Sequence, residues 1–317
     1  MTITLITGGC GFIGSYLVKK LVADNRHVRV LDNCDRGAAR RINDVINKVE
    51  FIQGDIRDPS IVNSCCKDVS RIHHLAYING TQNFYKHPDL VLDVAASGIL
   101  NLYNAIKDKE VKEFFLASTS EVYQYPTLIP TPEDERLIVP DVHNSRYTYG
   151  GGKIFCELMA LHAISKHVDK TIVYRPHNVY GADMGEEHVL PQFFRRMYSQ
   201  ANQENSSSFD FEIQGQGTET RAFIHISDFI EALMKIEDLG VNKEVYHIGN
   251  SEEISISEVV NLVASELGLK VNIKAGPLTK GSTNRRCPEI TKISLLGYKQ
   301  KVSLKEGISS LREWYTK

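Results

Sequence analysis

The sequence contains no pattern of paired cysteines. Its six cysteines form no CxxC motif, and only the neighbours Cys65 and Cys66 are close along the chain. Adjacent cysteines are poorly placed to bond to each other, and unpaired patterns are typical of proteins in reducing compartments. We therefore expect free thiols, no metal site and a cytoplasmic location.

Long apolar runs and an excess of one charge are also absent. No apolar stretch approaches the roughly 18 residues that a membrane span needs, and the first residues run directly into a glycine-rich turn without a basic or long apolar leader. We expect neither a signal peptide nor a membrane partner. Because 37 Lys and Arg balance 39 Asp and Glu, the formal net charge is only −2, and no global basic field attracts nucleic acid. The expected partner is a small molecule.

The sequence does contain short apolar segments that alternate with longer helical patterns. The chain has 317 residues, of which 42% are hydrophobic and 24% charged, as in ordinary globular proteins. Segments with strand character cover residues 3–7, 27–31, 50–53, 71–75, 113–117 and 171–174. This rhythm predicts repeated βαβ units in an α/β fold, with a doubly wound parallel (Rossmann) sheet and a smaller mixed α/β lobe.

The rhythm ends after Arg175 and Pro176. Residues 202–208 are polar and predict a surface loop. Residues 223–248 have the pattern of a strand, a helix and a strand that can rejoin the sheet. We therefore expect a dinucleotide-binding domain over residues 1–177, joined by 223–248, and a substrate lobe over residues 178–317.

The glycine motif Gly9-x-Gly11-x-x-Gly14 follows the first predicted strand and opens an amphipathic helix. Glycines permit a tight turn and a close approach of a pyrophosphate to the helix N-terminus, where N–H groups and the helix dipole attract phosphate. Asp32 ends the second predicted strand, where a carboxylate accepts both ribose hydroxyls and repels a 2′-phosphate. The motif therefore favours NAD over NADP. Three nearby arginines bear on that preference, although a solvated face is their simpler interpretation; they are Arg36, Arg40 and Arg41.

Tyr149 and Lys153 are spaced i, i+4 on a predicted helix, so the phenol and the ammonium share one face. A lysine and the positively charged nicotinamide ring both favour the phenolate form of a tyrosine. Thr119, Ser120 and Glu121 follow the fifth predicted strand, at the sheet edge where ligands bind in such folds. These elements together predict a catalytic site.

The chain resembles the extended short-chain dehydrogenase/reductase family, specifically its NAD-dependent nucleotide-sugar epimerases, dehydratases and decarboxylases. The motifs that carry the resemblance are TGGCGFIG, Asp32, GDIRD, HLAY, STSEVY, Tyr149 with Lys153, RPHNVYG and GQGTETRAFIHISD. The resemblance implies that Tyr149 takes the proton of the sugar C4 hydroxyl as hydride leaves C4 for NAD. It also implies that Lys153 tunes Tyr149 and holds the nicotinamide ribose, and that Thr119 hydrogen-bonds the same sugar hydroxyl.

The resemblance also implies two sets of binding residues and a nucleotide-diphosphate sugar as substrate. The cofactor residues are Gly8, Gly11, Phe12, Ile13, Gly14, Asp32, Asn33, Asp55, Ile56, Leu75, Ala76, Tyr149 and Lys153. Asp55 has a helix cap as its alternative role. The substrate residues are Thr119, Ser120, Asn178, Leu190, Arg221 and Arg286. Arg286 is the weaker candidate, since an arginine pair is most often a solvated patch.

Three departures from the family pattern stand out. Three glycines, residues 150–152, separate Tyr149 from Lys153 and loosen the helix start by roughly 1 kcal/mol each; they leave room for a substrate or cofactor. Ala95 replaces a frequent asparagine, and Tyr77 replaces the second alanine of HLAA. Packing is the simpler role for Tyr77, and a structural role is expected for the pair His73–His74.

The reaction that follows C4 oxidation depends on Glu121. The 4,6-dehydratases and some decarboxylases that the chain resembles carry a T-x-E motif, and in the dehydratases that glutamate is the C5 base. Glu121 therefore favours chemistry at C5, and capping of the strand end is its simpler role. Ser120 stands where many dehydratases have an aspartic acid, although the GDP-mannose type of dehydratase has T-S-E. The sequence offers no evident further cation for a uronate carboxylate, and epimerases are the most common members of the family with chains this short. We rank a sugar 4-epimerase first, a 4,6-dehydratase second and a nucleotide-uronate decarboxylase third. A non-catalytic NAD-binding regulatory protein is the alternative from another class. Resemblance also implies a homodimer through helices near residues 88–107 and 145–167.

Overall fold

The computed structural model describes residues 2–277 and 283–317. Its central sheet has seven strands in the order β11-β6-β5-β4-β1-β2-β3, and every pairing is parallel. The strands are β1 (Ile3–Thr7), β2 (His27–Asp32), β3 (Val49–Gln53), β4 (Val69–His74), β5 (Glu113–Ala117), β6 (Lys170–Pro176) and β11 (Val245–Ile248). The predicted doubly wound α/β fold is confirmed, with strand ends that differ from the prediction by at most two residues.

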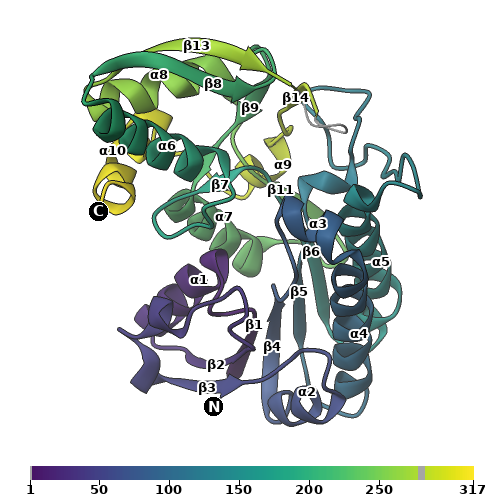
Figure 1. The fold of residues 1–317 in the computed structure, drawn as a ribbon. Coiled ribbons are helices and arrows are strands. Elements are labelled where there is room, and N and C mark those ends of the chain that lie inside the picture. Colours follow the sequence, from purple (N-terminus) through teal and green to yellow (C-terminus); the bar gives the residue numbers. More distant parts are fainter. Residues whose placement is uncertain (1, 278–282) are drawn as a thin grey trace.

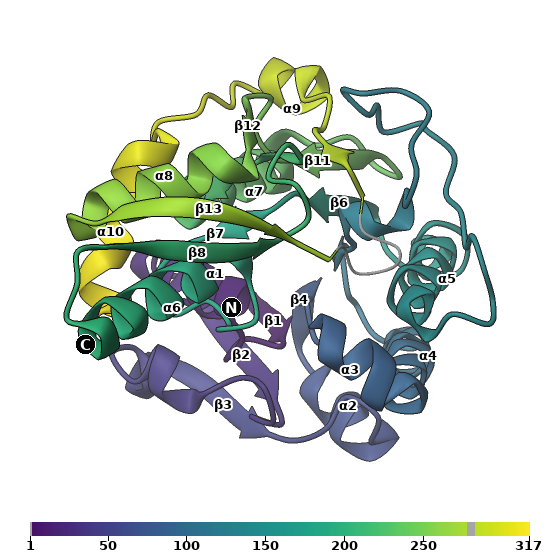
Figure 2. The same cartoon turned by 45° about the horizontal axis from the view of Figure 1, so that its top comes forward.

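Helices cover both faces of this sheet (Figures 1 and 2). One face carries α2 (Pro59–Cys65), α4 (Pro88–Ile106) and α5 (Thr148–His162), and the other carries α1 (Phe12–Ala23), α7 (Ile226–Leu239) and α9 (Thr291–Leu295). Each face has its own apolar cluster, represented by Ile99 and Cys156 on one side and by Leu17 and Phe229 on the other. Burial on both faces explains why strands such as β5 read as continuous apolar runs.

A second group of elements lies beyond the carboxyl ends of the strands (Figure 1). Its two long parallel strands are β8 (Ser208–Gln214) and β13 (Lys270–Gly276), and its helices are α6 (Val189–Glu204), α8 (Ile256–Leu267) and α10 (Leu304–Tyr315). Phe209, Phe211 and Ile213 alternate with exposed residues along β8, because only one face of this pair is covered. The predicted loop 202–208 is shorter than expected: α6 continues through Glu204 and β8 begins at Ser208.

Two small sheets connect these groups. In the first, β7 (Val179–Tyr180) pairs with β10 (Ile224–His225); in the second, β9 (Thr220–Ala222) lies between β12 (Glu253–Ser255) and β14 (Arg285–Arg286). Within residues 223–248, therefore, β11 joins the central sheet whereas β10 does not. The remaining elements are α3 (Thr81–Lys86) and the 3-10 helices η1 (Ala39–Ile42), η2 (Ile46–Lys48), η3 (Ser120–Val122), η4 (Ser145–Tyr147) and η5 (Ile164–Lys166).

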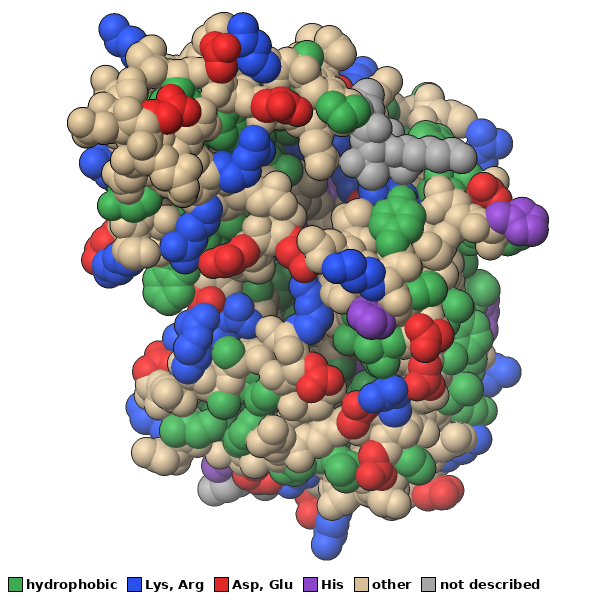
Figure 3. Space-filling model, viewed as in Figure 1, with side chains coloured by type: hydrophobic (Ala, Val, Ile, Leu, Met, Phe, Trp, Pro, Cys, Tyr) green, Lys and Arg blue, Asp and Glu red, His purple; other side chains and the backbone are tan. Residues whose placement is uncertain are grey.

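The space-filling view shows a hollow between the central-sheet group and the second group, with Lys and Arg side chains on both of its sides (Figure 3). No helix within residues 2–277 and 283–317 is long and apolar enough to cross a bilayer.

Candidate active site

A cavity of about 450 Å³ lies at the carboxyl ends of the strands. The strand order reverses between β1 and β4, and the crevice at such a reversal is the usual ligand site of doubly wound sheets. Most of the residues expected from the sequence line this cavity. They are Gly8, Gly11, Phe12, Ile13, Gly14, Asp32, Asn33, Asp55, Ile56, Leu75, Ala76, Thr119, Ser120, Glu121, Tyr149, Lys153, Asn178 and Arg286.

Two expected substrate residues lie off the cavity wall. Leu190 is buried in the apolar cluster of the second group, near Phe194 and Phe211. Arg221 lies on β9, where its guanidinium donates to the backbone carbonyls of Thr220 and Thr283 at 2.7 Å each. The structure therefore does not bring Leu190 to the site. Arg221 influences the site through its charge, which acts on Glu121.

The glycine turn at the start of α1 provides an unblocked helix N-terminus. Gly11 is the N-cap of α1 and has no side chain that could cap the helix. The N–H groups of the first turn therefore remain available for phosphate. A Cβ on Gly14 would lie 2.1 Å from the carbonyl oxygen of Gly8, and a Cβ on Gly8, whose φ is +76°, would lie 2.7 Å from the backbone nitrogen of Ala76. The turn is packed so closely that only glycine fits, as a pyrophosphate cradle requires.

Asp32 joins this turn to the loop after β2. Its Oδ2 accepts from the backbone N–H of Cys10 and its Oδ1 accepts from that of Cys34, both at 2.8 Å. The carboxylate is thereby held at the cavity wall, and each oxygen keeps a further lone pair for a ribose hydroxyl. These residues fit the adenosine half of NAD. Asp32, Cys10 and Cys34 also place one carboxylate oxygen and two thiols within 4.8 Å of one another.

Asp55 does not cap a helix, so the alternative role expected for it is wrong. Asp58 is the N-cap of α2, whereas Asp55 is paired with Arg57 at 2.8 Å and accepts from Asn33 at 3.3 Å. The hydrogen bonds from Arg57 hold the pKa of Asp55 down at about 2.

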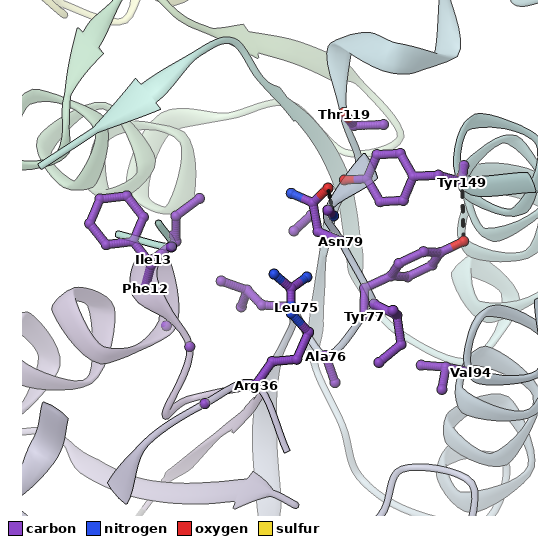
Figure 4. A pocket seen from close by; sticks show the side chains of 18 of the residues that line it. Phe12, Ile13, Arg36, Leu75, Ala76, Tyr77, Asn79, Val94, Thr119 and Tyr149 are labelled. Carbon is purple, nitrogen blue, oxygen red and sulfur yellow. Dashed lines mark hydrogen bonds between the residues drawn. The ribbon is translucent and has the colours of Figure 1, made fainter. Parts of the chain in front are cut away.

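Tyr149 and Lys153 point from the first turns of α5 toward the end of β5, as Figure 4 shows for Tyr149 and Thr119. Burial raises the pKa of Tyr149 to about 12, while a hydrogen bond from Thr119 and the charges of Arg36 and Arg286 act in the opposite direction. Burial lowers the pKa of Lys153 to about 8, and its Nζ donates to the carbonyl of Ala117 at 2.6 Å. The charge states of Tyr149 and Lys153 therefore depend on their burial and on the groups around them.

Glu121 also lines the cavity, where it forms an ion pair with Arg286. The Oε1 of Glu121 is 2.5 Å from the Nη1 of Arg286. Burial raises the pKa of Glu121, but Arg286, Arg146 and Arg221 outweigh it and hold that pKa below its usual value. Three arginine charges thus act on one carboxylate. The expectation that no cation is available for a uronate carboxylate, and the interpretation of Arg286 as a solvated patch, are both wrong.

Sequence reasoning missed several residues of the site. Arg36 reaches into the cavity although it stays partly exposed (Figure 4). Arg41 also lines the cavity while it pairs with Asp183, and Arg40 pairs with the same carboxylate outside the cavity. Arg146 also lines the cavity; its position three residues before Tyr149 was the available signal. Phe84 stacks on the ring of Tyr149 with centroids 4.9 Å apart.

The fold and the site define an NAD-binding α/β protein with a tyrosine–lysine centre of the short-chain dehydrogenase type. Residues 4–249 match the NAD dependent epimerase/dehydratase family, and the chain belongs to that family. Its cofactor is NAD. Its structural neighbours are extended short-chain dehydrogenase/reductase enzymes that act on nucleotide sugars.

Three similar proteins carry out three different reactions. UDP-glucuronic acid decarboxylase 1 of Danio rerio is 30% identical over 99% of this chain and 72% of its own length. The UDP-glucose 4-epimerase of Thermotoga maritima, solved with UDP-glucose, is 25% identical with a TM-score of 0.86, covering 99% of this chain and 98% of that one. The dTDP-glucose 4,6-dehydratase of Streptomyces venezuelae, solved with NAD, is also 25% identical with a TM-score of 0.86, over 99% and 97% of the two chains.

Proposed function

We propose that this protein is a nucleotide-diphosphate-sugar 4-epimerase that retains NAD through each catalytic cycle. Thr119, Tyr149 and Lys153 meet at the end of β5. Gly11, Gly14 and Asp32 would hold NAD, which would supply reversible hydride transfer at C4. Tyr149 as phenolate accepts the proton of the C4 hydroxyl, Thr119 hydrogen-bonds the same oxygen, and Lys153 favours the phenolate by its charge. With that hydride transfer supplied, epimerisation would require only that the keto sugar present its other face to the cofactor.

The observation that carries the choice of epimerase is the ion pair between Glu121 and Arg286, 2.5 Å between charged atoms. A dehydratase needs a free base at C5 and an acid for the leaving hydroxyl. Here the carboxylate of Glu121 is engaged by an arginine, which weakens it as a base, and the neighbouring residue is Ser120, whose hydroxyl is a poor acid. An epimerase needs neither group.

A nucleotide-uronate decarboxylase is the second candidate, favoured by the three arginines near Glu121. Arg146, Arg221 and Arg286 together exceed the charge of that single carboxylate. Arg146 and Arg286 line the cavity, so a uronate carboxylate can compete with Glu121 for a guanidinium. The similarity to a UDP-glucuronic acid decarboxylase supports the same candidate.

Product mass distinguishes these reactions. The purified protein is incubated with UDP, GDP, CDP and dTDP sugars, including neutral hexoses and glucuronate, and the products are analysed by liquid chromatography with mass spectrometry. A product of unchanged mass and new retention time supports the epimerase. Loss of water indicates a dehydratase and loss of carbon dioxide a decarboxylase, and either overturns the proposal. The absorbance of the purified protein should also show bound NAD(H), with no sustained net production of NADH during turnover.

We further propose a homodimer through α4 and α5. These helices pack side by side and expose four large apolar side chains, Leu92, Leu100, Phe155 and Leu158. Apolar side chains gathered on adjacent helices are typical of a subunit interface. Light scattering at micromolar concentration should give twice the mass of one chain, and the mass of a single chain would contradict this proposal.

A further inference from the structure

The three departures from the family pattern meet at one point in the structure. A Cβ built on Gly152 would lie 2.3 Å from the phenol oxygen of Tyr77 and 3.0 Å from the Cβ of Ala95. The expectation that the glycines leave room for a substrate or cofactor is therefore wrong at Gly152, because the hydroxyl of Tyr77 takes that space. The small residues at positions 95 and 152 and the large residue at position 77 form one packing unit.

Tyr77 contacts both members of the tyrosine–lysine pair. The ammonium of Lys153 lies 3.9 Å from the centroid of the Tyr77 ring. Its hydroxyl donates to the backbone carbonyl of Tyr149 at 3.4 Å, the contact drawn in Figure 4. The two tyrosine rings also meet edge to face, with centroids 5.3 Å apart and planes at 83°. Tyr77 thus touches the charge of one residue and the backbone and ring of the other.

We propose that Tyr77 is a positioning residue for Tyr149 and Lys153, and that Gly152 and Ala95 are small because they accommodate it. The aromatic face attracts an ammonium, most strongly where water is excluded, and Lys153 is only 3% exposed. The ring and the carbonyl of Ala117 restrict a flexible four-carbon side chain to one place. The hydroxyl secures the first turn of α5, where three consecutive glycines make the helix least stable on its own.

Other charged and titratable groups also face Lys153. The thiol of Cys156 and the carboxylate of Glu157 lie on the same helix as Lys153. The buried imidazole of His74 faces it from β4. The carboxylate favours the ammonium, but it is itself paired with Arg175 at 2.6 Å. The ring of Tyr77 and the carbonyl of Ala117 are therefore the groups that lie directly against the ammonium.

The inference rests on the proposed function in that Tyr149 and Lys153 act in turnover, and a pair of variants tests it by a pH profile. Tyr77→Leu removes the ring, whereas Tyr77→Phe keeps the ring and removes only the hydroxyl. Without the ring the neutral amine is favoured, so the alkaline fall of kcat should move to lower pH in Tyr77→Leu and stay in place in Tyr77→Phe. At neutral pH we expect Tyr77→Leu to lower kcat about tenfold and to change KM by less than about twofold. Equal pH profiles for Tyr77→Leu and the unchanged protein would overturn the positioning role.

A second experiment needs no turnover. Gly152→Ala creates the contact with the Tyr77 hydroxyl, and Tyr77→Phe removes it, because the next ring atom is 3.6 Å from the added Cβ. Gly152→Ala should lower Tm, and addition of Tyr77→Phe should restore a large part of the loss. Gly151→Ala is the matched control: its nearest neighbour is Val139 at 3.3 Å, so its effect should not depend on residue 77.

The two experiments separate failure of this inference from failure of the proposed function. If the product analysis reveals a decarboxylase or a dehydratase, the pH profiles are recorded with that reaction and the inference stands or falls as before. If Gly152→Ala is as stable as Gly151→Ala, or if Tyr77→Phe restores nothing, the packing unit is disproved even where epimerisation is observed.

Discussion

The cofactor end and the sugar end of the cavity are built in different ways. At the cofactor end, the wall is formed by Asp32 and by five residues of one turn (Gly8, Gly11, Phe12, Ile13 and Gly14), and the groups offered to the ligand are mainly backbone N–H groups. At the sugar end, three separate segments offer side chains: the segment after β5 with Thr119 and Glu121, α5 with Tyr149, and β14 with Arg286. The first end depends on the absence of side chains, and the second depends on their chemical identity. Substitutions should therefore damage the two ends differently.

The largest effect is expected at the sugar end, from Tyr149→Phe. Loss of the phenol removes the proton acceptor while the ring keeps its stacking on Phe84, so kcat should fall by about 10³-fold. Because the cofactor end is untouched, the absorbance of bound NAD(H) should remain that of the unchanged protein. Activity is measured as initial rates of product formation. Retained biological function with this variant would instead support a non-catalytic NAD-binding protein.

Gly14→Ala should have the opposite signature. The added Cβ would meet the carbonyl oxygen of Gly8 at 2.1 Å, so the turn must shift at a cost of about 1–3 kcal/mol in the free energy of unfolding. We expect loss of bound NAD together with a lower Tm, measured by absorbance and by thermal unfolding. Gly268→Asn is the control, since that residue has φ of +72°, which Asn tolerates, and no atom lies within 4 Å of its Cβ position. Retention of NAD by Gly14→Ala would contradict the close packing between residue 14 and the carbonyl of Gly8.

The same difference explains what the sequence could predict. Strands, the glycine turn and Asp32 are local features, so their periodicity and order along the chain identify the sheet and the cofactor end. The partner of Glu121 was not predictable, because Arg286 is 165 residues away and reaches the cavity only through the pairing of β14 with β9. Arg36 and Tyr77 are near recognised motifs, but the direction of a side chain depends on packing that no local pattern records.

Arg286→Gln should have an intermediate effect. The carboxylate of Glu121 loses its partner, and burial then raises its pKa, so protonation of Glu121 should extend to higher pH. We expect KM for the nucleotide sugar to rise about tenfold, with bound NAD unchanged. Arg285→Gln is the matched control, because this neighbour pairs with Glu253 and is half exposed. Equal KM values for the two variants would place the sugar elsewhere.

Asp55→Asn should have the smallest effect, at the outer edge of the cofactor end. The pKa of Asp55 is held at about 2 by hydrogen bonds from Arg57, below the roughly 3.9 of a free aspartate. Its contribution to stability is therefore complete above about pH 4 and is lost as pH falls toward 2. Because the pair is partly exposed, we expect about 1 kcal/mol at neutral pH, and the difference between variant and unchanged protein should disappear near pH 2. Asp93→Asn is the matched control, because Asp93 also pairs with Arg57, at 3.0 Å, but lies outside the cavity. A fall in NAD affinity for Asp55→Asn but not for Asp93→Asn would assign Asp55 to the cofactor; equal affinities would leave it a purely structural residue.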